Sequence, residues 1–339
     1  MRREILWAAA VGISFGLIIA FGAWRINSSL NKSKPGNPEA TPASQNPGAE
    51  FKISLNTPED NDVVTTSPVA VSGITKPLSW IVFSGEKGDY ILQSDENGIF
   101  SQDVDLTAGI NQIKITALDS TNSQTLQKVL VVYSSAFQLR SNVPTPASAA
   151  TGEAAISQNV AQKVAAARNT AKAYLGVVTD ITSTTIQIKT PESQIQQISV
   201  GTDGITVVNT KGTNNKQVKL TDVAIGDFIV AMGYVNGNQV LAAQRILITD
   251  PLQNSQLSVS LNKVTAITIK SLTVTDIKNG KSATLTPDKN TAIASFANGK
   301  TSNIKITAIA TDDLIIYVTD TSGTPPLLRS IFDIGKPQG

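Results

Sequence analysis

The sequence predicts a mainly β protein behind a single N-terminal membrane helix. Three observations predict this fold class: an uncharged apolar run near the N-terminus, short runs of β-branched and aromatic residues separated by turn residues, and an internal repeat in the C-terminal half. In chain order we expect a transmembrane signal-anchor helix (1–25), a disordered tether (26–50), a β-sandwich (51–134), a linker (135–152), an amphipathic helix (153–173) and two small β-barrel-like copies (174–250 and 257–335).

The run from Ile5 to Trp24 has the length of a membrane helix. About twenty residues without a charge are enough to cross the hydrocarbon layer, and Trp7 and Trp24 lie near its ends, where indoles favour the membrane interface. A cleaved signal peptide, with Arg2 and Arg3 as its charged start, is the alternative. The run is longer than is usual for such a peptide, so we favour the anchor. Both interpretations place the remainder outside the cytoplasm, and the anchor predicts a single-pass membrane protein of the periplasm or cell surface.

Two segments have the composition of linkers. Residues 26–50 are rich in Asn, Ser and Pro and cannot bury enough apolar surface to offset the entropy of ordering. Residues 135–152 have a similar composition. In residues 153–173, by contrast, Ala, Gln, Lys and Arg are frequent and apolar residues recur at helical spacing, which predicts a short amphipathic helix.

Residues 51–134 contain seven short β-type runs, the number expected of an immunoglobulin-like (Ig-like) sandwich. Asn97-Gly98 is typical of a tight reversal between two of the runs. Large apolar groups gain most from burial, so we expect Trp80, Phe83, Phe100 and Ile115 in the core.

The motifs of this segment resemble those of bacterial Ig-like domains from surface proteins and exported glycosidases. The resemblance rests on Leu55-x-x-Pro58, Ser67-Pro68-Val69-x-Val71-x-Gly73, Asp95-Glu96-Asn97-Gly98-x-Phe100 and Leu106-x-x-Gly109-x-Asn111. In that family the module is an accessory or spacer. The resemblance therefore implies a fold and a compartment, but no reaction.

The C-terminal half contains two copies of one pattern. A shift of about 86 residues places one copy on the other, and the matched pairs include Val178 with Val264, Val223 with Ile309, and Asp227 with Asp313. The first copy, with Gly226-Asp227-x-Ile229-x-Ala231-x-Gly233, resembles small bacterial β-barrel domains of unassigned function. The second copy departs from that pattern, because Asp312 replaces Gly226 and Thr319 replaces Gly233.

Composition argues against catalysis and against nucleic acid as a partner. The 28 Lys and Arg nearly balance the 26 Asp and Glu, and the basic residues are scattered rather than gathered in a patch. The chain has no Cys and no His, so it lacks a thiolate nucleophile and the usual general base near neutral pH. Any reaction would depend on carboxylates, Lys, Tyr or Ser.

Three kinds of pattern offer candidate chemistry. Ser29-Leu30-Asn31-Lys32 and Ser260-Leu261-Asn262-Lys263 have the Ser-x-x-Lys spacing of penicillin-recognising enzymes, but neither falls on an expected helix. Two acidic turns, residues 59–62 and 95–97, offer oxygen ligands for Ca²⁺, although solvated hairpin turns explain them better. Asp227 and Asp313 occupy equivalent places, as paired catalytic carboxylates might, but each precedes a strand and a turn-capping role is favoured.

The sequence therefore predicts no catalytic, cofactor-binding or metal-binding residues. We expect a non-enzymatic, membrane-anchored structural or interaction protein of a bacterial cell envelope, held to the membrane by its N-terminal helix, with a protein or a cell-wall polymer as partner. A carbohydrate- or cell-wall-binding accessory of an exported complex is the alternative, although Trp80 is the only Trp outside the apolar run. A hydrolase that uses carboxylates alone is a remote third.

Overall fold

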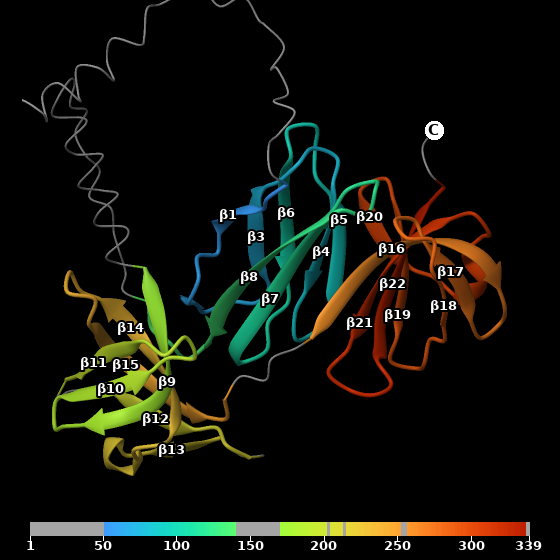
Figure 1. Ribbon diagram of the computed structural model, residues 1–339. Coiled ribbons are helices and arrows are strands. Elements are labelled where there is room, and N and C mark those ends of the chain that lie inside the picture. Colours follow the sequence, from blue (N-terminus) through green and yellow to red (C-terminus); the bar gives the residue numbers. More distant parts are fainter. Residues whose placement is uncertain (1–50, 140–169, 202–203, 213–214, 252–255, 337–339) are drawn as a thin grey trace, which may run out of the picture. The chain divides into compact units, whose positions relative to one another are not determined.

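The described part of the chain is built almost wholly of β-strands (Figure 1). The computed structural model describes residues 51–139, 170–201, 204–212, 215–251 and 256–336. Residues Phe51–Gly339 form one compact unit, within which the strands follow one another in three stretches that we call the first, second and third β units.

The first β unit places two layers of strands over one apolar core. A three-stranded sheet has the order β1-β3-β6, and the other strands belong to a twelve-stranded sheet that contains β2-β8-β7-β4-β5 in this order. Phe83 and Phe100 meet edge to face in the core, with ring centroids 5.8 Å apart. The bounds are β1 Ser54–Thr57, β2 Asp62–Val64, β3 Val69–Ile74, β4 Trp80–Ser84, β5 Asp89–Gln93, β6 Ile99–Val104, β7 Gly109–Leu118 and β8 Gln124–Tyr133.

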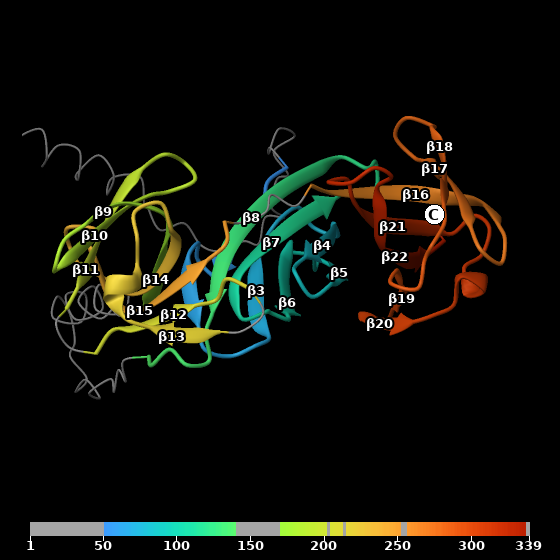
Figure 2. The same cartoon turned by 90° about the horizontal axis from the view of Figure 1, so that it is seen from below.

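Of the four residues expected in that core, Phe83, Phe100 and Ile115 are buried in it. Trp80 is only partly buried, and it packs instead against a cluster that the first and third units share. Its ring meets Phe296 edge to face at a centroid distance of 5.0 Å. The long hairpin of β7 and β8 is plain in Figure 2.

The second and third β units have the same strand order. Pairing runs β11-β10-β9-β14-β15-β12-β13 in the second and β18-β17-β16-β21-β22-β19-β20 in the third. The bounds in the second unit are β9 Ala171–Ile181, β10 Thr185–Lys189, β11 Ile195–Val200, β12 Thr206–Asn209, β13 Lys216–Val218, a 3-10 turn Leu220–Asp222, β14 Phe228–Val235 and β15 Leu241–Thr249. In the third they are β16 Leu257–Ile267, β17 Leu272–Asp276, β18 Ser282–Leu285, β19 Ala292–Ala297, β20 Lys300–Asn303, a 3-10 turn Ile306–Ala308, β21 Leu314–Asp320 and β22 Leu327–Gly335.

The correspondence extends to single backbone contacts. The Val178 amide donates to the Asp227 carbonyl at 2.8 Å, and the Val264 amide donates to the Asp313 carbonyl at 2.9 Å. Gly226 has φ +95° and its counterpart Asp312 has φ +72°, so the turn keeps its left-handed backbone although the glycine is gone.

Apolar clusters join the three units. Val63, Val132 and Phe137 of the first unit share one cluster with Ala173, Val230 and Met232 of the second. Val82, Ile91 and Leu118 share another with Val259, Ile316 and Phe332 of the third. Strand β2 also pairs with β8 on one side and β9 on the other, so a single sheet passes from the first unit into the second.

The predicted fold class is wrong beyond its mainly β character. An independent Ig-like sandwich is excluded because one of its layers continues into the second unit. Two separate closed β-barrels are also wrong. The third unit is an open seven-stranded sheet, and the second, although β11 pairs with β15, shares its strand β9 with the sheet of the first unit. The described chain is mainly β, with a β-solenoid of about three turns.

The predicted linker helix is corrected where the structure describes it. Residues 153–169 lie outside the described residues, but Ala171 to Ala173 begin strand β9. Ala171 pairs with Tyr234 and Ala173 with Met232, and both alanines are buried while Lys172 between them points the other way. Alanine favours a helix, but here the two alanines alternate with Lys172 between the faces of a sheet. Tertiary packing therefore outweighs local helix propensity.

The predicted single-pass membrane localisation also needs correction. The expected transmembrane signal-anchor, residues 1–25, and the tether, residues 26–50, lie outside the described residues. Within the ranges given above, no helix has the length and apolarity needed to cross a membrane. The helical elements of those ranges are two 3-10 turns of three residues each.

Candidate functional site

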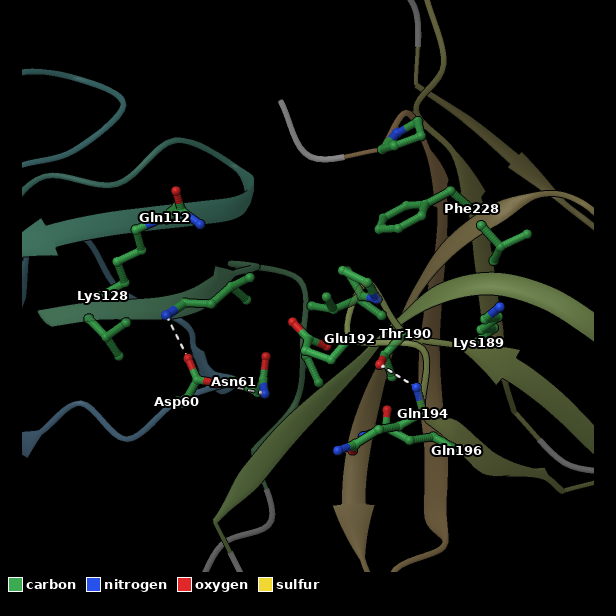
Figure 3. Close-up of a pocket in the computed structure, with 17 residues that line it drawn as sticks. Asp60, Asn61, Gln112, Lys128, Lys189, Thr190, Glu192, Gln194, Gln196 and Phe228 are labelled. Atoms are coloured by element: carbon green, nitrogen blue, oxygen red, sulfur yellow. Dashed lines mark hydrogen bonds between the residues drawn. The ribbon is translucent and has the colours of Figure 1, made fainter. Parts of the chain in front are cut away.

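A cavity of about 790 Å³ lies between β8 of the first unit and the strands β9–β11 of the second (Figure 3). Its polar side chains come from both units, and Leu175, Val177 and Phe228 supply an apolar wall. The residues that line it are Asp60, Asn61, Gln112, Lys128, Val129, Leu130, Ala173, Leu175, Val177, Lys189, Thr190, Pro191, Glu192, Gln194, Gln196, Phe228 and Pro251.

Backbone contacts hold the two sides of this cavity together. The Ala173 amide donates to the Asn61 carbonyl at 2.8 Å, and Asp62 pairs with Lys172 where β2 meets β9. Within the cavity, the Asp60 carboxylate accepts from the Leu130 amide at 2.8 Å and the Thr190 hydroxyl accepts from the Gln194 amide at 3.3 Å. Asp60 and Thr190 are therefore occupied in shaping the wall.

Six other side chains of the lining have unused hydrogen-bonding capacity. In the described ranges they form no side-chain hydrogen bond or ion pair with the protein, so their donors and acceptors face solvent. Two lysines and two carboxylates (with Asp60) balance in charge, and the remaining groups are amides. Such a surface suits an uncharged polar or zwitterionic ligand. The six are Gln112, Lys128, Lys189, Glu192, Gln194 and Gln196.

The first acidic turn is built around a lysine. Lys172 Nζ lies 2.7 Å from Glu59 Oε2 and 2.8 Å from Asp62 Oδ1, and it also donates to the Asp60 carbonyl at 3.3 Å. The hydrogen bond from Lys172 lowers the pKa of Glu59. Burial alone would lower the pKa of Lys172, but its hydrogen bonds to Asp62 and Glu59 raise it. The ammonium therefore occupies the place that a Ca²⁺ ion would need.

The second acidic turn is a hairpin turn. Asp95 Oδ1 accepts from the amides of Asn97 at 2.9 Å and Ile99 at 2.7 Å, and Gly98 follows with φ +79°. In the described residues, no group of three or more acidic side chains is placed to hold a metal ion.

Asp227 and Asp313 each close a turn in their own unit. Asp227 accepts from the Ala224 amide at 3.0 Å, and Asp313 accepts from the Ala310 amide at 2.7 Å. Lys211 also donates to Asp227 at 2.8 Å, and this hydrogen bond is the main reason that the pKa of Asp227 is lowered. The turn-capping interpretation is confirmed, and the carboxylates do not form a pair.

The second Ser-x-x-Lys match has the wrong backbone for a catalytic pair. Ser260 and Lys263 lie on strand β16. The Ser260 hydroxyl is hydrogen bonded to the Asn262 amide group at 2.7 Å, whereas Lys263 Nζ reaches Asp312 at 2.7 Å. The first match, residues 29–32, lies outside the described residues.

The sequence did not reveal the cavity. Its side chains come from segments far apart in the chain, between Asp60 and Pro251, which are brought together where β2 joins β8 to β9. The sole local signal is an excess of Gln and Lys on β7, β8, β10 and β11, which is ordinary for solvated strands.

Comparison with known proteins gives weak structural similarities, two of which are described here. No protein family model and no curated protein matches the sequence. One solved structure, of a Ca²⁺-stabilized adhesin that helps an Antarctic bacterium reach out and bind ice, is 15% identical over 84% of this chain and 73% of that chain, with a TM-score of 0.19. Another, from work on host cell surface retention of a 1.5-MDa bacterial ice-binding adhesin, is 12% identical over 84% and 96% of the two chains, with a TM-score of 0.18. These neighbours are bacterial adhesins, and scores this low leave the function to be argued from the chain's own residues.

Proposed function

We propose that this chain is a non-enzymatic structural and interaction protein, in which three β units act as one stiff spacer that presents its surface to a protein or polymer partner. The observation that carries the proposal is the apolar cluster shared by the first and third units. Leu118, Ile316 and Val318 are fully buried there. Burying one such side chain stabilises a protein by about 1.5–3 kcal/mol, so separating the units would be costly.

Polar contacts fix the geometry of the same junction. Lys114 Nζ donates to the Leu257 carbonyl at 2.6 Å, and the Gln124 side-chain amide donates to the Val259 carbonyl at 3.0 Å. Both donors lie on the β7–β8 hairpin, and both carbonyls lie on β16. These directional bonds align the two units in one register, which an apolar contact alone would not do.

The charged groups of the chain serve its turns and junctions. Asp95, Asp227 and Asp313 accept backbone amides, Lys172 holds the first acidic turn, and His and Cys are absent from the sequence. None of these charged groups is both free of other contacts and able to act as a general base near neutral pH. These features favour a structural role over a catalytic one.

Distances between spin labels would test the stiff spacer. The chain has no Cys, so Ser101→Cys with Thr301→Cys labels the first and third units at two exposed sites. We expect one narrow distance distribution in electron spin resonance, as narrow as that of the control pair Ser101→Cys with Gln127→Cys inside the first unit. A broad distribution for the first pair alone would show a flexible joint and overturn the proposal.

A second candidate function, carbohydrate or cell-wall binding, is favoured by the unoccupied amides around the cavity. Gln112, Gln194 and Gln196 could donate to and accept from sugar hydroxyls, with Val177 and Phe228 behind them. A glycan array probed with the full chain and with Gln194→Ala/Gln196→Ala tests this function. A signal that the double variant loses supports it, and an array without signal rejects it.

A further inference from the structure

The second and third units differ at one sheet edge. In the second unit, β11 pairs in parallel with β15, with Ile198 opposite Leu241 and Val200 opposite Ala243. In the third unit the counterpart β18 is the last strand of its sheet and pairs with β17 alone. Among the described residues, the edge of β18 therefore offers backbone donors and acceptors without a strand partner.

Side chains account for this opening. The two hairpins align through their strand pairs, because Ile186 lies opposite Ile198 and Leu272 lies opposite Leu285. Leu285 therefore takes the place of Ile198 and is also buried, whereas Pro287 takes the place of Val200, whose amide donates to the Thr184 carbonyl in the second unit. Leu241 is fully buried, whereas Pro326, which takes its place in the pairing of β21 with β22, is exposed. The third unit therefore lacks Val200 and Leu241, two of the buried residues that close the gap in the second.

The opposite strand is also held away. Arg329 takes the place of Gln244, since the strand pairing skips both residues. Its guanidinium donates to the Gly85 carbonyl at 2.8 Å and lies 3.3 Å from Asp89 in the first unit. The Leu328 carbonyl accepts the Thr291 hydroxyl at 3.0 Å. Strand β22 is therefore engaged elsewhere, and the free edge belongs to β18.

Four lysines flank this free edge. Because Leu272 lies opposite Leu285, the turn before β17 and the segment after β18 meet at one end of the hairpin, and its tip forms the other end. Each end carries two exposed lysines, and none of the four forms an ion pair within the described ranges. In the second unit Thr184 takes the place of Lys270, and Gln194 takes the place of Lys281. The four are Lys270, Lys278, Lys281 and Lys289.

We propose that the edge of β18 binds an extended acidic polypeptide segment of a partner protein by strand addition. Main-chain hydrogen bonds along Ser282–Leu285 supply the pairing, and carboxylates near both ends of the added strand meet the lysines. This inference specifies the partner class of the interaction role proposed above. The views in Figures 1 and 2 show β18 at the margin of its unit, next to β17.

The proposal has a direct binding test with the full chain. The probe is a fluorescein-labelled nonapeptide of alternating Val and Thr with two Glu at each end, followed by fluorescence anisotropy. We expect saturable binding, weakened by about tenfold or more in Lys270→Gln/Lys278→Gln/Lys281→Gln/Lys289→Gln, since several charge pairs are lost. The matched control, Lys87→Gln/Lys216→Gln/Lys300→Gln/Lys305→Gln, removes the same charge from exposed sites elsewhere and should bind as the parent does.

A second probe separates strand addition from simple charge attraction. The same peptide with N-methyl groups on alternate amides keeps its charge but cannot pair as a strand, and we expect it to lose most of its binding. Deuterium exchange should show that the parent peptide protects the amides of 282–285.

Equal binding of the methylated peptide, or no binding of the parent peptide, overturns the proposal. The second result would mean that the lysines only shield the edge from self-association. Neither result bears on the spacer, which the label distances test separately.

Discussion

Arg329 on β22 forms an ion pair with Asp89 on β5, with 3.3 Å between Nη2 and Oδ1, and Asp89 is almost completely buried. Ser330 adds a hydroxyl that donates to the same carboxylate at 2.8 Å. The pair connects the first and third β units beside the apolar cluster that they share. Its strength and its pH dependence can therefore be used to test the junction.

Removing Arg329 should be strongly destabilising. Arg329→Met would leave Asp89 buried without its cation, and losing one partner of a buried pair costs about 3–5 kcal/mol. Urea unfolding measures the change. The double variant Arg329→Met/Asp89→Asn should recover part of the loss, because no unpaired charge remains. A loss below about 1 kcal/mol in the single variant would mean that the pair is solvated.

Asp89 should make stability fall as pH rises. Burial raises the pKa of Asp89, although Arg329 and Ser330 oppose this shift. The folded state then binds the proton more tightly than the unfolded chain, so stability decreases with rising pH between the ordinary carboxyl pKa and the raised one. Asp89→Asn should remove this decrease in urea unfolding measured across that interval. An identical pH profile for both proteins would contradict the prediction.

Leu118 should couple the first unit to the third. Leu118→Ala should cost about 2–5 kcal/mol and should also increase hydrogen exchange in β16 and β21, since Val259 and Ile316 pack in the same cluster. Ile115→Ala is the control, because Ile115 is buried in the core of the first unit alone. If both variants leave exchange in the third unit unchanged, the units unfold independently.

Gly226 should resist substitution. Its φ of +95° disfavours any side chain, so Gly226→Ala should lose about 1 kcal/mol or more in thermal unfolding. Gly237→Ala is the matched control, since that glycine is outside the left-handed region and a Cβ there would meet open space. Asp312→Gly, at the equivalent position in the third unit, should be tolerated by the backbone. Equal losses at positions 226 and 237 would contradict the account.

Lys172 should control the first acidic turn. Glu59 has a lowered pKa because Lys172 donates a hydrogen bond to it, so its stabilising contribution is present above the ordinary carboxyl pKa and is lost as pH falls through the lowered one. In Lys172→Met, carboxyl NMR titration should find the pKa of Glu59 higher than in the parent. Ca²⁺ should leave the melting temperature of the parent unchanged, and a rise on adding Ca²⁺ would show that the ion displaces the lysine.

Most strands could be predicted from sequence, but their connections could not. The runs around Trp80, Phe100 and Gln112 are strands because β-branched and aromatic residues there alternate between core and surface. Strand β2 was missed because Asp62 gives it the composition of a turn, yet this short strand joins two units into one sheet. Local patterns carry no information about such a long-range pairing.

The candidate site was hidden for a related reason. Gln112 and Gln196 are ordinary solvated residues until the two units meet around them. The open edge of β18, in contrast, has a trace in the sequence, since Pro287 follows the strand closely and has no amide hydrogen to donate. Only the strand pairs show that it takes the place of Val200 in the second unit.

The edge-to-face contact between Trp80 and Phe296 makes the junction observable by light. Trp80 is the one indole outside residues 1–50, so a chain with Trp7 and Trp24 changed to Phe would emit from this contact alone. Its emission wavelength would then shift to the red whenever water enters between the first and third units, which would give a label-free optical record of their separation.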